Sequence, residues 1–94
     1  MANVIGSGFM RWDTTVNAAF DGTNGPRNPK VTQIRFESGA TGGLTTLQIG
    51  AKVYFSWPIP ADSVLTLDTP QGTYMPGLAL TALGTNVIVT VTYA

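Results

Sequence analysis

Histidine and cysteine are both absent from this 94-residue sequence. Their absence excludes serine–histidine and cysteine–histidine nucleophile pairs, imidazole and thiolate metal ligands, and disulfides. Carboxylates remain, but no spacing among them selects the acid and base pair that a glycosidase needs. They are Asp13, Asp21, Glu37, Asp62 and Asp68. We therefore expect a protein that is not an enzyme and that holds no cofactor and no metal.

Charged residues are scarce as well. They make up 11% of the chain, whereas an ordinary soluble domain has roughly 25%. Five cations and five anions give a net charge of zero, so charge repulsion gives little protection against association. We expect other copies to cover part of the surface in a homotrimer, with a homodimer as the alternative. The other alternative is a monomer whose surface is solvated by its Thr, Asn, Ser and Gln side chains.

Long apolar runs are also missing. No stretch approaches the roughly 20 residues of a membrane helix, and the opening "MANVIGSGFMRW" lacks the basic and apolar regions of a signal peptide. A sequence pI near 6.0 is not typical of nucleic-acid binding, which normally uses a clustered basic face. We expect neither a membrane nor a nucleic acid as partner.

The sequence contains no amphipathic helical pattern, because 11 Gly and 6 Pro interrupt it and β-branched residues dominate its apolar segments. Alternation with a period of two is clearest in "VTQIRFE" (31–37) and in "NVIVTVTYA" (86–94). The latter puts Val87, Val89, Val91 and Tyr93 on one face. Turn signals recur along the rest of the chain, which predicts an all-β fold. We expect a small antiparallel β-sandwich or barrel-like jelly roll of about seven or eight short strands.

One domain is expected over residues 1–94, because two halves would each have too small a core. Residues 1–8 have no clean period and predict an extended arm that becomes ordered against a neighbour. The last strand, in contrast, is expected to be paired inside a sheet. Residues 21–30, "DGTNGPRNPK", predict a long loop. Its "DGTNG" start resembles a calcium loop, but a turn is favoured because Thr32 stands where an EF-hand has a carboxylate.

Between these segments the pattern gives specific elements. "SGATGG" (38–43) predicts a turn, and the flanking segments of Gly50 predict a hairpin whose second strand puts Val53, Phe55 and Trp57 on one face. Pro58 and Pro60 indicate an edge strand, and a further turn is expected at Pro-Gln-Gly (70–72). Core candidates outside the last strand include Met10, Trp12, Val16, Phe20, Leu65 and Leu67.

Five side chains are candidates for partner binding. Arg27 and Lys30 lie on a proline-held loop, where they could meet acidic groups of a partner, and Arg11 is a further cation. Trp57 and Tyr93 are in phase with apolar neighbours, which favours the core. Tyr54 and Tyr74 are not, so they are candidates for contact with a protein partner or, alternatively, with a sugar.

Residues 31–94 resemble the small β-sandwich virion proteins of tailed bacteriophages, in particular capsid decoration (cement) proteins and related trimeric knob or fibre domains. The likeness is one of pattern. It consists of "VTQIRF", a Gly-rich turn, "KVYFSWPIPA", "TPQGTYMPGLAL" and the final "NVIVTVTYA". Residues 1–30 are not covered by it.

The resemblance implies a protein made in the host cytoplasm and located on the outer surface of the virion. It would bind the major capsid protein there, usually as a trimer, and clamp neighbouring capsid subunits. The alternative is a receptor- or carbohydrate-binding module of a phage fibre or tail tip.

Overall fold

A computed structural model describes residues 4–5, 8–15, 18–20, 22 and 26–94 of the chain. The described residues form an all-β, antiparallel fold with no helix, so none of them lies in a helix that could cross a membrane. The strands are β1 (Val4–Ile5), β2 (Phe9–Trp12), β3 (Lys30–Ile49), β4 (Lys52–Ile59), β5 (Val64–Tyr74), β6 (Leu78–Ala82) and β7 (Thr85–Tyr93).

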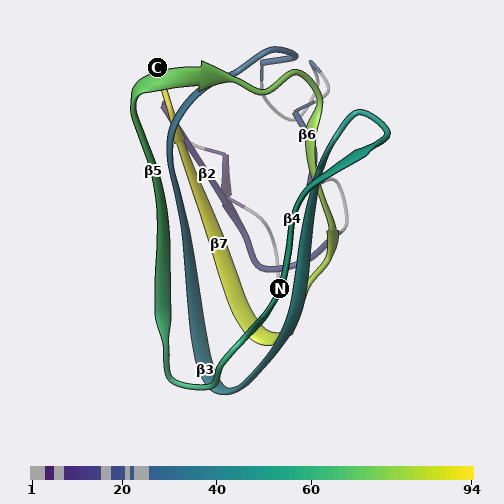
Figure 1. The fold of residues 1–94 in the computed structure, drawn as a ribbon, viewed down its shortest axis with the longest axis vertical. Coiled ribbons are helices and arrows are strands. Elements are labelled where there is room, and N and C mark those ends of the chain that lie inside the picture. Colours follow the sequence, from purple (N-terminus) through teal and green to yellow (C-terminus); the bar gives the residue numbers. More distant parts are fainter. Residues whose placement is uncertain (1–3, 6–7, 16–17, 21, 23–25) are drawn as a thin grey trace.

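The strand β3 organises the whole fold, because it is 20 residues long and belongs to both layers. Its first half pairs with β7 and β5 in the sheet β1-β2-β7-β3-β5, and its second half pairs with β4 and β6. Figure 1 shows the sharp bend of β3 at the lower end of the molecule. The result is a β-sandwich in which one strand crosses from one layer to the other.

The bend contradicts the turn predicted at "SGATGG". Here β3 continues through all six residues, and its register shifts between Ser38 and Gly42. Gly42 (φ +75°) and Gly43 (φ +146°) have backbone conformations that L side chains rarely adopt. Both remain paired, to Thr85 and Ile59 respectively. The glycines therefore bend a strand that stays in the sheet, whereas the sequence pattern suggested that they end it. The turn predicted at Pro-Gln-Gly (70–72) is also wrong, because these residues lie inside β5.

Backbones approach closely at this bend. A Cβ atom on Gly84 would lie 2.7 Å from the backbone of Gly43, and one on Gly42 would lie 2.2 Å from the carbonyl oxygen of Ile59. Both distances are too short for non-bonded atoms. The chain between β6 and β7 therefore crosses the bend of β3 at a distance that only glycine permits.

The C-terminal strand β7 lies between β2 and β3, as the alternation predicted for a strand paired inside a sheet. Val87, Val89 and Val91 are buried. Tyr93 is half-buried against the edge of Phe20, with ring centroids 5.3 Å apart. The amide N–H of Ala94 donates to the carbonyl oxygen of Lys30 at 2.9 Å, which ties down the end of the chain.

The N-terminal third closes one side of the sandwich. Residues 18–20 lie beside β6, where the Phe20 N–H donates to the Leu78 carbonyl and the Leu80 N–H donates to the Ala18 carbonyl, both at 2.8 Å. Met10, Trp12 and Phe20 are buried, as predicted. Leu65 and Leu67 of β5 pack against the core with part of their surface exposed. Val16, the remaining core candidate in the N-terminal third, lies outside the described residues.

The described part of the arm predicted over residues 1–8 pairs with its own chain. Val4 and Ile5 form β1, which pairs with Arg11 and Met10 of β2 in the same chain. Gly8 is also held, because its carbonyl oxygen accepts a 2.9 Å hydrogen bond from the N–H of Tyr93. Val4, Ile5 and Gly8 therefore contact β2 and β7 of their own chain. Residues 1–3 and 6–7 lie outside the described residues.

The hairpin at Gly50 is confirmed, but its second strand is not buried as expected. A register shift at Leu47/Gln48 inserts one extra residue in β4, so Val53 and Phe55 no longer share a face. Trp57 keeps the phase of Phe55, yet it is 57% exposed on a strand that lies at the edge of the sheet. The predicted core position of Trp57 is therefore wrong.

The close approach at the bend gives a stability test. Gly84→Ala should lower the free energy of unfolding by about 2 kcal/mol or more, because the backbones must separate to admit the methyl group. Gly39→Ala is the matched control. Its Cβ would lie 3.3 Å from the Cβ of Asn86 and 3.8 Å from the Asn86 carbonyl oxygen, so we expect a loss of about 0.5 kcal/mol or less. Urea denaturation measures both. Equal midpoints would show that the sheets do not depend on this approach.

Candidate functional site

The end of the molecule opposite the bend carries three of the five predicted contact residues. Residues 26–30 run beside residues 74–77, a pair of segments that we call the basic ribbon. The Met75 N–H donates to the Pro29 carbonyl and the Gly77 N–H donates to the Arg27 carbonyl, both at 3.0 Å. Lys30 is the register partner of Tyr74. The predicted attachment loop is thus held in place by backbone hydrogen bonds over residues 26–30.

Lys30 and Tyr74 interact directly in this ribbon. The Lys30 ammonium nitrogen lies 5.9 Å from the centroid of the Tyr74 ring, within the range of a cation–π interaction. The stem of Lys30 crosses Gly72, where a Cβ atom would come within 2.7 Å of it. Tyr74 is 61% exposed. The pair therefore presents an aromatic ring and a positive charge together at the surface.

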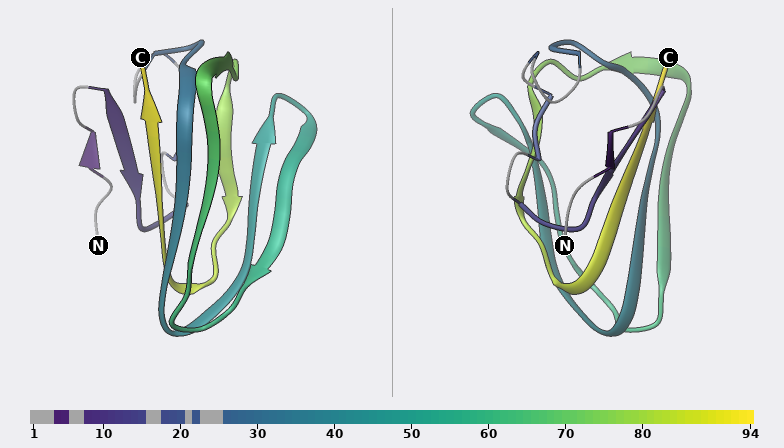
Figure 2. Two further views of the ribbon diagram at one scale, coloured as in Figure 1. Left: turned by 60° about the vertical axis from the view of Figure 1, so that its left-hand side comes forward. Right: turned by 180° about the vertical axis from the view of Figure 1, so that it is seen from behind.

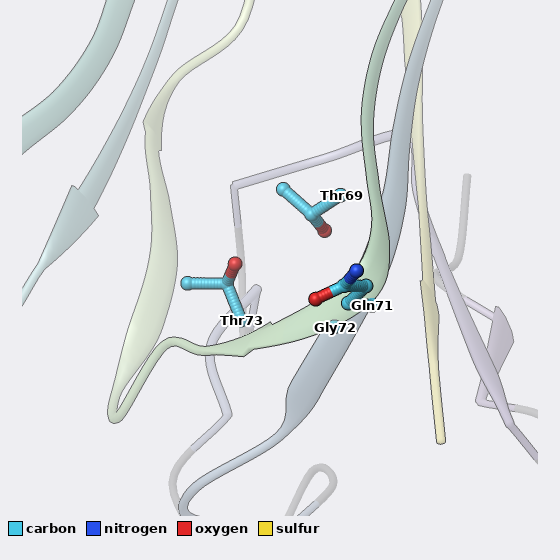
Figure 3. Close-up of a pocket in the computed structure, with 4 residues that line it drawn as sticks. All are labelled: Thr69, Gln71, Gly72 and Thr73. Atoms are coloured by element: carbon cyan, nitrogen blue, oxygen red, sulfur yellow. The ribbon is translucent and has the colours of Figure 1, made fainter.

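A shallow cavity of about 360 Å³ lies next to this pair. It is lined by Thr69, Gln71, Gly72 and Thr73 of β5. In Figure 3 the oxygen atoms of the two threonines and of the Gln71 amide point toward a shared space. The Thr69 hydroxyl also donates to the Val31 carbonyl, which fixes its side chain. Hydroxyl and amide groups of this kind can bind a neutral polar ligand by hydrogen bonds.

Arg11 and Tyr54 lie elsewhere. Arg11 is on the outer face of the first sheet, 3.9 Å from the Asp13 carboxylate and in one cross-strand row with Thr90 and Arg35. Tyr54 lies on β4 and is 40% exposed. The five predicted contact residues thus belong to three separate surfaces.

The carboxylates of the described residues do not gather in one place. Glu37 pairs with Arg35 at 3.6 Å, and Asp68 accepts a 3.1 Å hydrogen bond from the Gln33 amide. Asp62 occupies a turn with φ +53°. Within the part of the chain that the structure describes, no three acidic side chains come together as a metal site. The "DGTNG" segment falls mostly outside that part, so the calcium-loop alternative stays untested.

Several exposed residues were not identified from the sequence as contact residues. Leu44, Val53, Trp57 and Val64 are each more than half exposed although they are large and apolar. The strand phase gave the face of Trp57 but not whether another layer covers it. For the cavity, the only sequence signal was a glycine among polar residues in "TPQGTY".

Comparisons of this chain with protein-family models, with curated proteins and with solved structures returned no match.

The contact between Lys30 and Tyr74 can be measured by a double-mutant cycle. Lys30→Met keeps a long stem over Gly72 and removes the charge, and Tyr74→Leu removes the ring. We expect a coupling free energy of about 0.5 kcal/mol between the two changes, typical of an exposed cation–π pair. Urea denaturation of the two single variants and the double variant gives this number. Strictly additive losses would mean that the two side chains do not interact.

Proposed function

We propose that this chain is a non-enzymatic structural protein of a bacteriophage virion. It binds the outer surface of the capsid as an oligomeric decoration protein and clamps neighbouring capsid subunits. The pattern resemblance of residues 31–94 supports this proposal, as do the absence of histidine and cysteine and the low charge content. A compact sandwich with several exposed apolar side chains is suited to contact with other proteins.

The observation that carries the proposal is the basic ribbon. Arg27 is exposed, and neither Arg27 nor Lys30 forms an ion pair with a described residue. Two backbone hydrogen bonds hold the segment that presents them. A segment held by backbone hydrogen bonds, with two cations that form no ion pair among the described residues and an exposed Tyr74, fits an acidic protein surface. Its attachment loses little conformational entropy. In the proposed complex this surface is the major capsid protein.

The attachment test compares two double variants that each remove two positive charges. Arg27→Gln/Lys30→Gln should weaken binding to capsids prepared without this protein, most strongly at low salt, because such charges mainly set association rate and salt dependence. Arg11→Gln/Arg35→Gln should bind almost normally, since these cations lie on the outer face of the first sheet. Cosedimentation with capsids at several salt concentrations measures both. The reverse order of effects would place the attachment on that face, and no binding by the wild type would end the capsid proposal.

A carbohydrate-binding tip module is the second candidate, favoured by the cavity on β5. Thr69, Gln71 and Thr73 supply hydrogen-bonding groups, and the Tyr74 ring is adjacent in sequence. The position of the chain on the virion separates the decoration protein from the carbohydrate-binding module. Labelling of the chain on purified virions should mark the shell, whereas a label on the tail tip, with glycan binding lost in Gln71→Ala, would favour the second.

A further inference from the structure

The edge strand β4 carries an observation that capsid attachment does not use. Along its eight residues β4 pairs with β3, and its other edge meets no strand of the described chain. In Figure 2 the hairpin of β3 and β4 diverges from the other strands. Free edges of this length normally carry several charges or other features that prevent pairing. Here β4 has Lys52 at one end, the bulge at Tyr54 and Pro58 near the other end, and it has no other charged residue.

Large apolar side chains lie along this strand and its neighbour. Val53 is 58% and Trp57 is 57% exposed, and Leu44, opposite Pro58 on β3, is also exposed. Trp57 is the register partner of the buried Thr45, so it shares the inner face of its sheet. Next to it, Phe55 stacks on Phe36 of the core at 4.6 Å. On this inner face Trp57 is more than half exposed, although it lies between Phe55 and the buried Ile59.

We propose that β4 is a self-association edge, at which a second copy of this chain adds its own β4 in antiparallel pairing centred on Ser56. The pairing joins the two three-stranded layers into one continuous sheet. It is a two-fold contact and closes as a dimer. The proposal does not depend on capsid attachment, because it uses a different surface of the molecule.

Charge favours a second copy in this orientation. The strand has no acidic residue, and its one cation, Lys52, lies at its beginning. Antiparallel pairing about Ser56 puts the two copies of Lys52 at opposite ends, whereas parallel pairing would put like charges side by side, which is unfavourable. The same register places Phe55 opposite Trp57 of the second copy on the inner face. Aromatic cross-strand pairs of this kind stabilise sheets.

The proline supports the same centre. In an edge strand the proline nitrogen normally lies on the side away from the neighbouring strand. Because orientation alternates along a strand, Ser56 then presents its N–H and C=O on the same free side as Pro58. Two copies of Ser56 can therefore exchange a pair of backbone hydrogen bonds across the two-fold axis.

The exposed side-chain area on β4 indicates a weak dimer. If aromatic side chains offer roughly 150–250 Å² each, the exposed parts of Trp57 (57%) and Tyr54 (40%) come to about 200 Å². A standard interface covers about 800 Å² on each partner. Val53, Leu44 and the strand backbone add to the aromatic area but keep the contact at the small end of the range. We expect dissociation constants in the micromolar range, on the order of 10–100 µM.

Sedimentation velocity over a concentration series from about 1 to 300 µM, spanning that range, tests the proposal on the full chain. The wild type should pass from monomer to dimer. Trp57→Lys should weaken dimerisation about tenfold or more. Val64→Lys is the matched control, since Val64 is equally exposed (59%) but lies on β5, and it should dimerise normally. A wild type that stays monomeric, a trimer, or equal effects of the two substitutions would overturn the proposal.

A cross-link keeps the test decisive if Trp57→Lys does not fold. Because the chain has no cysteine, Ser56→Cys introduces a single thiol. At the proposed axis two such residues have Cα atoms about 5.5 Å apart, a distance that a disulfide spans. Mild oxidation should give covalent dimers of Ser56→Cys and few of Thr81→Cys, which is exposed on β6. Equal yields for the two variants would contradict the proposed pairing.

Discussion

The backbone contact between Gly43 and Gly84 is the constraint on which the remaining structure depends. Because Gly84 has no side chain, the link between β6 and β7 can cross the bend of β3 in backbone contact. A Cβ atom on Gly84 would lie 2.7 Å from the backbone of Gly43. Because β3 stays paired through the bend, each neighbour must also pass from one layer to the other there. The β6–β7 link does so at Gly84, and the β4–β5 link does so where the Asp62 N–H donates to the Gly39 carbonyl at 2.7 Å.

This folded sheet has one closed side and one exposed strand. Residues 18–20 and β2 cover the side of β6 and β7, with Trp12 and Phe20 in edge-to-face contact at 5.6 Å. On the other side the hairpin of β3 and β4 diverges from the other strands (Figure 2), and Trp57 on this edge strand is 57% exposed. The basic ribbon lies at the end farthest from the bend (Figure 1). Two separate surfaces are therefore available for contact, one apolar and one cationic.

The sequence pattern was sufficient for elements whose burial is periodic. Val87, Val89 and Val91 of β7 alternate regularly, and the structure buries all three. It was not sufficient where glycine has two uses, because a glycine cluster can end a strand or bend one that remains paired, as at Gly42. Nor could the strand phase reveal the exposure of Trp57, because Phe55, Trp57 and the buried Ile59 share one face of the edge strand β4. Grouping Arg27 and Lys30 with Tyr74 required the register of β3 and β5.

The central claim is that this fold leaves the β4 edge open as a contact surface for a second copy. Amide hydrogen exchange by NMR, at protein concentrations below and above dimer formation, tests this claim most directly. If the edge pairs as proposed, the Ser56 amide exchanges rapidly in dilute protein and becomes protected as concentration rises, while the protection of Val89 in β7 does not change. Exchange at Ser56 that is independent of concentration would contradict it.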